Sequence, residues 1–344
     1  MPRRPTFYRY GSEPLAPEPR KPNVALELGD FDQQLQSPLY DGTIPPDIRK
    51  IIFDYAMTEY VDGEALYPPD ADYVRPNFLG KKRVSINLLL MCKRSYLETR
   101  HLPPVKKTHA FWHGEGPPEE SDDECDYFRR FQPAQLALVK EIHLFTEQCW
   151  IEGELPAVCK LDILQGIEKV KITLRKGDWW CSERNAPLAI TPHRPGADVR
   201  LMKEDWKREK AGEVVKWDPN CWGSAFRFLK GLKELEMEFE SYDFKSKELD
   251  EIVRHAVMWR FPMADGKVLS ADGLGSVKSS CWRGPPSGWA ECPSCLGREE
   301  DSEEEWEDEC RFCEEMHNLK RRPGPMLIIR SLRVQMTVLL GTNI

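Results

Sequence analysis

"LKELEMEFE", residues 232–240, has an apolar side chain at every second position from Leu235 to Phe239. Leu235, Met237 and Phe239 alternate there with glutamates, which is typical of a strand with one buried and one polar face. Leu232 precedes this run at a spacing of three residues. The stretch therefore predicts a strand that contributes one face to a hydrophobic core.

The same spacing of apolar residues recurs at three other places in the chain. The further instances are Val139, Ile142 and Leu144; Ile167, Val170, Ile172 and Leu174; and Ile329, Leu332, Val334 and Met336. Helical stretches are expected at about 155–165, 222–231 and 246–260. In the last of these, one face carries Leu249, Ile252, Val253, Ala256 and Val257. Alternating strands and helices predict right-handed β–α units around a largely parallel sheet.

The strand motif is similar to that of leucine-rich repeats. The intervals between the four instances, 28, 65 and 97 residues, are irregular for a repeat protein. Two interpretations of residues 136–344 therefore stay open. They are a degenerate leucine-rich-repeat-like solenoid, or an α/β domain with four ordinary buried strands.

The composition predicts a folded protein with one strongly acidic segment. The chain has 344 residues, 40% of them hydrophobic and 10% aromatic, which is enough to fill a core. Its formal net charge is −8. Between Cys295 and Cys310 there are nine acidic residues and one arginine, so this segment alone accounts for the whole net charge.

Two Cys-x-x-Cys pairs flank the acidic segment. They are Cys292 with Cys295 and Cys310 with Cys313, at the spacing C-x2-C-x14-C-x2-C. Two such turns bring four thiolates to one point, which predicts a structural Zn²⁺ site of the Cys₄ type. His317 is an alternative fourth ligand. A redox pair would need one Cys-x-x-Cys at a helix start and not two facing pairs, and a disulfide pair is disfavoured in an intracellular protein. We expect residues 281–322 to form a zinc-binding, acidic insertion that resembles a zinc ribbon.

The predicted metal site argues against two functional classes. Four thiolates leave no open position for a water molecule or a substrate, so catalytic zinc is disfavoured. A Cys₄ site is itself formally negative, and the acidic segment adds to that charge. Nucleic acid would be repelled, because its affinity for proteins depends on neutralising phosphates.

No export or membrane signal is visible in the sequence. Residues 1–40 read as a flexible, Pro-rich arm without the apolar core of a secretory peptide, and no apolar run reaches transmembrane length. The eleven cysteines fit free thiols and metal ligands better than a disulfide framework. We therefore expect a cytoplasmic or nuclear protein with no membrane partner.

Residues 41–113 are expected to be largely helical. In "TIPPDIRKIIFDYAM", residues 43–57, the prolines fix an extended start and Asp47 favours a helix N-terminus. One face of this helix is apolar: Ile48, Ile51, Ile52, Tyr55 and Ala56. A polar, proline-interrupted stretch follows at about 60–83.

A second helix is predicted in "SINLLLMCKRSYLETRHL", residues 85–102. Its buried side is expected to carry Leu88, Met91, Cys92, Ser95 and Tyr96. "THAFWH", residues 108–113, reads as a short strand, and residues 114–135 read as an acidic linker.

Catalytic motifs are not found in the chain. The phosphate-binding, nucleophile-elbow, zinc-protease and dinucleotide-binding patterns do not occur in it, and its seven histidines are dispersed. We therefore expect a protein without enzyme activity. Trp179 and Trp180, beside Cys181, are expected to line a groove at the edge of the sheet and to present it to a target protein.

Residues 43–113 resemble the F-box-like N-terminus of a large, mostly uncharacterised group of filamentous-fungal proteins. The first matching element is Ile44-Pro45-Pro46-Asp47-Ile48-Arg49. The second consists of Leu89, Leu90, Met91, Cys92, Lys93, Tyr96 and Glu98, and a strand with aromatic residues follows. Met91 and Thr99 depart from the Val and Ala that are usual in this group. The resemblance extends loosely to about residue 240 and excludes the cysteine pairs.

This resemblance implies a function in protein recruitment. F-box helices bind the adaptor subunit of cullin–RING ubiquitin ligases, while the C-terminal repeats hold a target protein. The adaptor-binding residues would be Pro45, Pro46, Ile48, Ile51, Ile52 and Tyr55. The alternative is a zinc-stabilised scaffold or regulatory protein without a ubiquitin-ligase link, in which the same apolar face packs against the protein itself. Either way the expected fold class is α+β, with F-box-like helices followed by a leucine-rich-repeat-like sheet domain.

Overall fold

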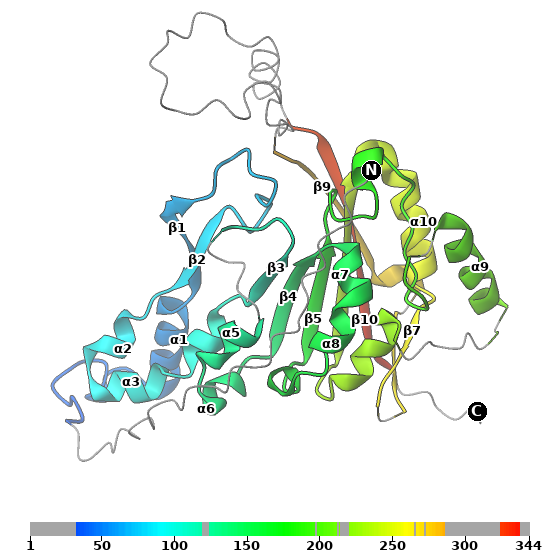
Figure 1. Ribbon diagram of the computed structural model, residues 1–344. Coiled ribbons are helices and arrows are strands. Elements are labelled where there is room, and N and C mark those ends of the chain that lie inside the picture. Colours follow the sequence, from blue (N-terminus) through cyan, green and yellow to red (C-terminus); the bar gives the residue numbers. More distant parts are fainter. Residues whose placement is uncertain are drawn as a thin grey trace, which may run out of the picture. The chain divides into compact units, whose positions relative to one another are not determined.

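The chain folds into a mixed α+β structure with two compact units. The structure is a computed structural model, and it describes residues 32–118, 124–196, 198–211, 213, 220–264, 266–271, 273–285 and 324–337. Among these, the smaller unit holds residues 32–53 and 87–100, and the larger unit holds the rest. Figure 1 shows the elements of both units.

The smaller unit is helical. It contains the first part of α1 (Pro46–Ala56), α2 (Asn87–Met91) and α3 (Lys93–Thr99). The boundary between the units falls inside α1, after Phe53. The larger unit begins there and includes α4 (Leu102–Lys106) together with all described strands.

An eight-stranded mixed sheet forms the centre of the larger unit. Its order is β3-β4-β5-β6-β10-β8-β7, and β9 also pairs with β10. The strands are β3 (Ala110–His113), β4 (Glu141–Thr146), β5 (Lys169–Leu174), β6 (Glu234–Tyr242), β7 (Arg260–Pro262), β8 (Val268–Ser270), β9 (Val277–Arg283) and β10 (Met326–Thr337). Strands β3 to β6 are parallel, whereas β10 is antiparallel to β6, β8 and β9.

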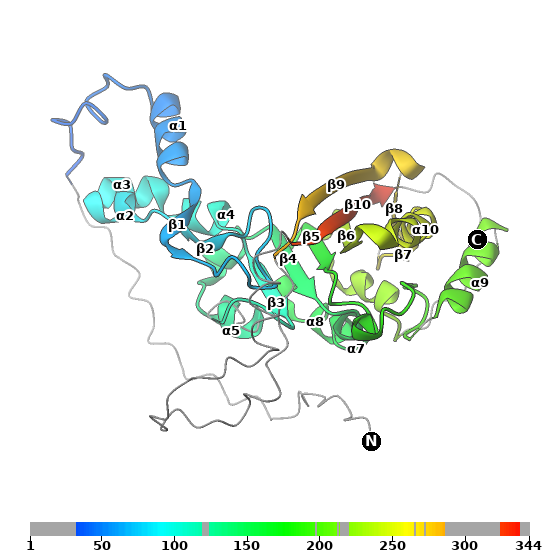
Figure 2. The same ribbon diagram turned by 90° about the horizontal axis from the view of Figure 1, so that it is seen from above.

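Helices and 3₁₀ turns connect the strands of this sheet. They are α5 (Glu124–Arg129), α6 (Pro133–Leu136), α7 (Gln148–Gly153), α8 (Leu155–Val158), α9 (Val199–Lys210) and α10 (Ser246–Ala256), with 3₁₀ turns η1 (Asp162–Leu164), η2 (Ser182–Arg184), η3 (Trp222–Phe228), η4 (Asp243–Lys245) and η5 (Gly273–Ser276). Figures 1 and 2 show α7, α8 and α10 on the same side of the sheet. Between them lies the main core, to which Met237, Ile151 and Ile252 belong.

The four strands expected from the apolar spacing are confirmed, as is the short strand at 110–113. They correspond to β4, β5, β6 and β10, and to β3. The helix expected at 246–260 is α10, which ends at Ala256, while the stretch 222–231 forms a 3₁₀ turn instead of an α-helix. The expectation of a largely parallel sheet holds only for β3 to β6. A side-chain pattern of period two fixes the faces of a strand but not its direction.

The stretch at 60–83 contains an antiparallel hairpin that the sequence did not predict. Its strands are β1 (Glu59–Leu66) and β2 (Gly80–Val84), and their register shifts between Val61 and Leu66. A Cβ atom at Gly80 would lie 2.9 Å from the Ala65 carbonyl oxygen, so a larger residue would push the strands apart. The hairpin and the loop after β1 belong to the larger unit.

That loop, residues 67–79, covers part of the second face of the sheet. Its Phe78 packs edge-on against Phe145 of β4, with 4.8 Å between ring centroids. Phe145 also stacks on Trp112 of β3 at 3.9 Å. These three rings form a small core of their own, separate from the core under the helices. Beside these rings, the same face of β5 and β6 is polar, because Lys171 and Thr173 lie there opposite Glu236 and Glu238.

Candidate functional site

All six residues expected to bind an adaptor are exposed. Pro45 and Pro46 lie at the start of α1 and face solvent. The exposed fractions of the four side chains on the apolar face are 49% for Ile48, 63% for Ile51, 40% for Ile52 and 84% for Tyr55. Four large apolar side chains at helical spacing therefore form one exposed stripe along α1, which we call the α1 apolar face.

The opposite face of α1 holds the helix in place. Its buried residues are Arg49 and Phe53. Arg49 donates from Nε to Glu98 Oε2 of α3 over 2.8 Å and from Nη1 to the Leu39 carbonyl oxygen over 2.9 Å. Its guanidinium also lies 5.0 Å from the centre of the Tyr40 ring. The helix thus turns Phe53 and the hydrogen-bonded Arg49 inward and leaves the α1 apolar face outside.

Tyr40 links the segment before α1 to α3. Its hydroxyl lies 2.7 Å from the Ser95 hydroxyl, and the Arg94 guanidinium lies 4.3 Å from its ring centre. Burial raises the pKa of Tyr40. The smaller unit is therefore held by a polar network around a buried aromatic ring, and this network does not need the α1 apolar face.

The second predicted helix is in fact two short helices, and part of its expected buried side is wrong. Cys92 separates α2 from α3 because it is extended, with φ −161° and ψ 165°, and its sulfur accepts from the Ser95 N–H as the cap of α3. The break turns Met91 outward, where it is 59% exposed beside Leu90 at 75%. The smaller unit thus exposes further apolar surface.

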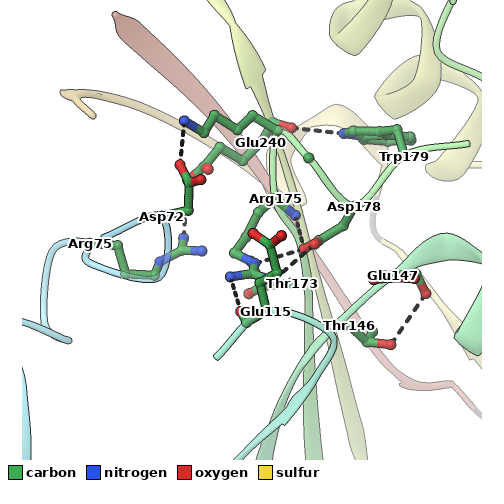
Figure 3. Close-up of polar contacts among 12 residues, drawn as sticks. Asp72, Arg75, Glu115, Thr146, Glu147, Thr173, Arg175, Asp178, Trp179 and Glu240 are labelled. Atoms are coloured by element: carbon green, nitrogen blue, oxygen red, sulfur yellow. Dashed lines mark hydrogen bonds and ion pairs between the residues drawn. The ribbon is translucent and has the colours of Figure 1, made fainter. Parts of the chain in front are cut away.

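A second group of charged and polar residues lies where the parallel strands end (Figure 3). Arg175, just after β5, binds Asp178 through two hydrogen bonds of 2.8 and 2.9 Å, and both side chains are buried. Its Nη1 donates to the Glu115 carbonyl oxygen over 2.6 Å. Asp178 and nearby charges raise the pKa of Arg175, although burial alone would lower it. This ion pair fixes the turn that follows β5.

Arg75 joins the covering loop to the glutamates of β6. Its Nη2 lies 3.5 Å from Glu238 and 3.4 Å from Glu240. Its Nη1 is buried and has no hydrogen-bond partner among the described residues. Burial acts to raise the pKa of Glu238, but Arg75 and Lys171 outweigh it and lower that pKa. These ion pairs connect the loop to the sheet, and removing one partner would leave a buried charge uncompensated.

The geometry of this cluster fits a structural network. Both oxygens of Asp178 accept from Arg175, and Glu238 accepts from Lys171 over 3.1 Å and from Thr173 over 2.7 Å. His143 Nε2 lies 2.8 Å from the same Thr173 hydroxyl, and burial is the main reason that its pKa lies well below the usual value. These carboxylates are already committed to partners.

The thiol of Cys149, two residues after Glu147, is not activated. Cys149 donates to Glu147 Oε2 over 3.1 Å, and burial together with that glutamate raises the pKa of Cys149 to about 12. A thiol with such a pKa is almost fully protonated near neutral pH, and the thiolate is the reactive form. Cys149 therefore has the properties of a packed cysteine.

Trp179 and Trp180 line one cavity, as expected from the sequence. The cavity has a volume of about 660 Å³ and lies beyond the ends of β4 and β5. Trp179 is buried, and its Nε1 donates to the Glu240 carbonyl oxygen over 2.9 Å, whereas Trp180 is 44% exposed. The other wall comes from residues 186–189 and the start of α9, and it was not predicted from the sequence.

The four predicted zinc ligands, Cys292, Cys295, Cys310 and Cys313, lie outside the described residues, and so does His317. Within the described part of the chain, no group of three or more His, Cys, Asp or Glu side chains is arranged to hold a metal ion. What the structure does describe is the base of the intervening segment. There β9 and β10 run antiparallel, and the Gly284 N–H donates to the Pro325 carbonyl oxygen over 2.9 Å.

The base of this segment is tightly closed. A Cβ atom on Gly324 would lie 1.8 Å from the Gly284 carbonyl oxygen, so only glycine allows this approach of the two strands. The first residues of the expected insertion, Cys281 to Arg283, belong to β9. The segment therefore leaves the sheet and returns to it at one point, between β9 and β10.

Comparison with known proteins adds no relative. No protein-family model, no curated protein and no solved structure matches this chain. Among the described residues, the helices are too short or too polar for any of them to cross a membrane.

Proposed function

We propose that this protein recruits other proteins and that the α1 apolar face is its docking surface for the adaptor subunit of a cullin–RING ubiquitin ligase. One observation carries the proposal. Ile48, Ile51, Ile52 and Tyr55 are exposed together, while Arg49 and Phe53 on the opposite face hold the helix. Exposed apolar patches of this kind mark interaction sites in soluble proteins.

The identity of the partner rests on the sequence resemblance. Ile44-Pro45-Pro46-Asp47-Ile48-Arg49 matches the first helix of the fungal F-box-like group, and F-box helices bind such an adaptor. An F-box-like smaller unit and a leucine-rich-repeat-like larger unit are part of the same proposal. The alternative is that this face of α1 packs against the protein's own sheet domain.

The energetics require a partner surface larger than one helix face. Full burial of an Ile or Tyr side chain contributes roughly 1.5–3 kcal/mol, and association costs at least about 4 kcal/mol. The four side chains of the α1 apolar face are already partly buried, so the free energy gained by burying them fully exceeds the cost of association by only a modest amount. The exposed Leu90 and Met91 of the same unit offer further apolar surface to the adaptor.

The experiment is co-expression with the adaptor subunit followed by size-exclusion chromatography. We expect the two chains to co-elute, and we expect an Ile48→Asp/Ile52→Asp variant to lose the complex while keeping its circular dichroism spectrum. A matched control introduces two aspartates at exposed apolar positions of the larger unit, Leu66→Asp/Leu79→Asp, and should bind normally. A folded wild type that does not bind would reject the adaptor proposal.

We also propose that the two cysteine pairs bind one structural Zn²⁺ ion. The support is their spacing and the closed base between β9 and β10, which a cross-linked excursion would require. Elemental analysis of the purified protein should give about one zinc per chain. A Cys295→Ser/Cys313→Ser variant should lose the zinc, whereas Cys181→Ser/Cys281→Ser, which changes two exposed free thiols, should retain it. Retention by the first variant would reject the site.

The scaffold alternative makes a different prediction in the same experiments. A zinc-stabilised protein without a ubiquitin-ligase link would bind zinc but not the adaptor. Zinc at about one ion per chain together with no co-elution would therefore favour it. Co-elution that survives loss of the zinc would show that the metal segment and the α1 apolar face act independently.

A further inference from the structure

The cavity beside Trp180 has the shape and lining of a recognition groove. Its volume of about 660 Å³ falls within the range of ligand-binding pockets, and its walls are mainly apolar, from Trp179, Trp180, Leu188 and Val199. It lies beyond the carboxyl ends of the parallel strands β4 and β5. In α/β sheets this edge is the usual place for ligands.

Buried and partly buried hydrogen bonds fix the walls of this groove before anything binds. Trp180 donates its indole N–H to Glu152 Oε2 over 2.9 Å, and the same oxygen accepts the Gly196 N–H over 2.7 Å. Gln148 donates to Glu152 Oε1 and to the Ala189 carbonyl oxygen, each over 2.9 Å. The exposed Trp180 ring is thus held in one orientation, and a prepared surface lowers the entropic cost of binding.

The same hydrogen bonds determine what kind of group the groove accepts. The indole N–H groups of Trp179 and Trp180 are both committed to internal acceptors. The Glu152 carboxylate lies behind Trp180 and already accepts three hydrogen bonds. Neither indole N–H is therefore available to an occupant, and the aromatic and aliphatic walls favour a bulky apolar side chain over a polar one.

One charged group at the rim is available to an occupant. The side chain of Arg200 is 74% exposed, and the distance between its guanidinium and the Glu204 carboxylate is long for an ion pair, at 3.7 Å. The neighbouring Asp198 caps α9, because its Oδ1 accepts the Leu201 N–H over 2.8 Å. A carboxylate next to the apolar group would therefore find a cationic partner in Arg200.

We propose that this groove binds an extended segment of a partner protein, which inserts an aromatic or large aliphatic side chain beside Trp180 and places a neighbouring carboxylate on Arg200. Trp180 is 44% exposed, so the groove opens to the surface, as a chain that enters and leaves it requires. Tryptophan and arginine are also the residues that most often dominate protein interfaces. The inference does not depend on adaptor binding by α1, because the groove belongs to the larger unit.

The chain contains a built-in reporter for this proposal. Cys181 is an exposed free thiol that lines the groove, and Cys281 is an exposed free thiol on β9, away from it. Disulfide exchange at equilibrium reads out the affinity of a tethered group for the surface around each thiol. The probe is the disulfide of 3-mercaptopropionyl-phenylalanine, with the phenylalanine amide and the glycine acid as matched probes, and peptide mass spectrometry separates the two cysteines.

We expect the phenylalanine acid to occupy Cys181 ~10-fold more than the glycine acid, which corresponds to about 1.4 kcal/mol. The phenylalanine amide should fall between them, and Cys281 should show no preference. Trp180→Ala should abolish the preference for phenylalanine. That variant also removes a hydrogen-bond partner of Glu152, so a second variant is needed. Arg200→Glu changes an exposed residue, and it should reverse the preference of Cys181 for the phenylalanine acid over the amide. Equal occupancy by the three probes would overturn the proposal.

A competition experiment separates a peptide from a small apolar acid. The rate of Cys181 alkylation by iodoacetamide is measured with the peptide acetyl-Gly-Ser-Ala-Phe-Asp-Ser-Gly-amide, with its Phe-to-Ser counterpart, and with N-acetyl-phenylalanine. We expect the first peptide alone to slow alkylation, with no effect at Cys281. Equal protection by N-acetyl-phenylalanine would reassign the groove to small apolar acids, and a lack of protection by any of the three would reject it as a recognition site.

Discussion

Helices α1 and α10 have the same length and the same pattern of apolar residues, but they differ in what they bury. Each has eleven residues. In α1 the apolar positions are Ile48, Ile51, Ile52 and Tyr55; in α10 they are Leu249, Ile252, Val253 and Ala256, at identical spacing. The four residues of α10 are 0–3% exposed, whereas those of α1 are 40–84% exposed.

The difference comes from the surroundings of the two helices and not from their own sequences. Helix α10 lies against β6 and β10, and its apolar side completes the main core over Met237 and Leu332. Helix α1 is held from its other side, where Arg49 has two partners to bond. An amphipathic pattern predicts that a helix forms and which face is apolar. Whether the protein itself or another molecule covers that face depends on contacts distant in sequence.

The largest effect is expected at α10. We predict that Ile252→Asp lowers the free energy of unfolding by about 4 kcal/mol or more, because it removes a fully buried side chain and buries a carboxylate without a partner. Urea denaturation followed by circular dichroism measures this. Lys247→Asp, on the exposed side of the same helix, should change stability by no more than ~0.5 kcal/mol. A small effect of Ile252→Asp would mean that α10 is not packed as described.

The next effect is expected on the buried side of α1. We predict that Arg49→Met destabilises the smaller unit by about 2 kcal/mol, because hydrogen bonds to charged groups contribute roughly 1.5–3 kcal/mol. Amide hydrogen exchange of residues 47–53 reports this locally. Arg49→Lys should restore only part of the protection, since lysine lacks the planar fork that reaches both acceptors.

A double-mutant cycle checks the partner of Arg49. If Glu98 is the main partner, Glu98→Gln should cost less in the Arg49→Met background than in the wild type. Full additivity of the two substitutions would show that Arg49 does not hold α1 through α3, and the comparison of the two helices would lose its physical basis.

The strands could be predicted from the sequence because burial repeats every second residue in them. In β6, Leu235, Met237 and Phe239 enter the core, and the glutamates between them form the polar face. The β1–β2 hairpin could not be found in this way, since most of β1 and β2 is not buried and their charged residues follow no simple alternation. The apolar pattern also does not encode the direction of a strand. The sequence therefore predicted the strand β10 but not its antiparallel direction.

The candidate sites also differ in how far they could be predicted from the sequence. Arg175 and Asp178 are three residues apart at the end of a predicted strand, a local signal that sequence reasoning could have used. Arg75 and Glu238 are 163 residues apart, so nothing local connects them. For α1 the sequence predicted the apolar residues correctly, but their exposure depends on Tyr40, Glu98 and Leu39, which lie outside the helix.

Mild acid should lower the stability of the larger unit, which contains α10, and so distinguish it from the smaller unit, which contains most of α1. Burial is the main cause that lowers the pKa of His109, His143 and His255, all in the larger unit, and Lys171 and Arg75 lower that of His143 further. The unfolded chain then takes up protons below its ordinary histidine pKa of about 6.5, while the folded unit does not. Stability is therefore full above that pH and falls as the pH decreases below it.

We predict a loss of up to about 1.4 kcal/mol per pH unit for each such histidine just below pH 6. Urea denaturation at pH 7.5 and at pH 5.5 measures the loss for the larger unit, and hydrogen exchange follows the smaller unit separately. His143→Gln, which keeps a side chain able to bond Thr173, should reduce the pH dependence. An unchanged dependence would show that His143 is protonated in the folded protein.

The smallest effect on stability is expected at the α1 apolar face, and it is the most informative. We predict that Ile52→Asp changes the free energy of unfolding by no more than ~0.5 kcal/mol, because solvent can hydrate a carboxylate at a position that is 40% exposed. The same substitution should weaken adaptor binding. It replaces an isoleucine of the α1 apolar face by aspartate, as Ile252→Asp does on the apolar face of α10.

The two isoleucine substitutions therefore form a matched pair. A cost at Ile52 close to that at Ile252 would mean that the protein covers both apolar faces itself, and the docking proposal for α1 would fall with the comparison. A negligible cost at Ile52 together with lost adaptor binding leaves one explanation for the apolar residues of α1. They would then be retained for a partner, since the fold gains almost nothing from them.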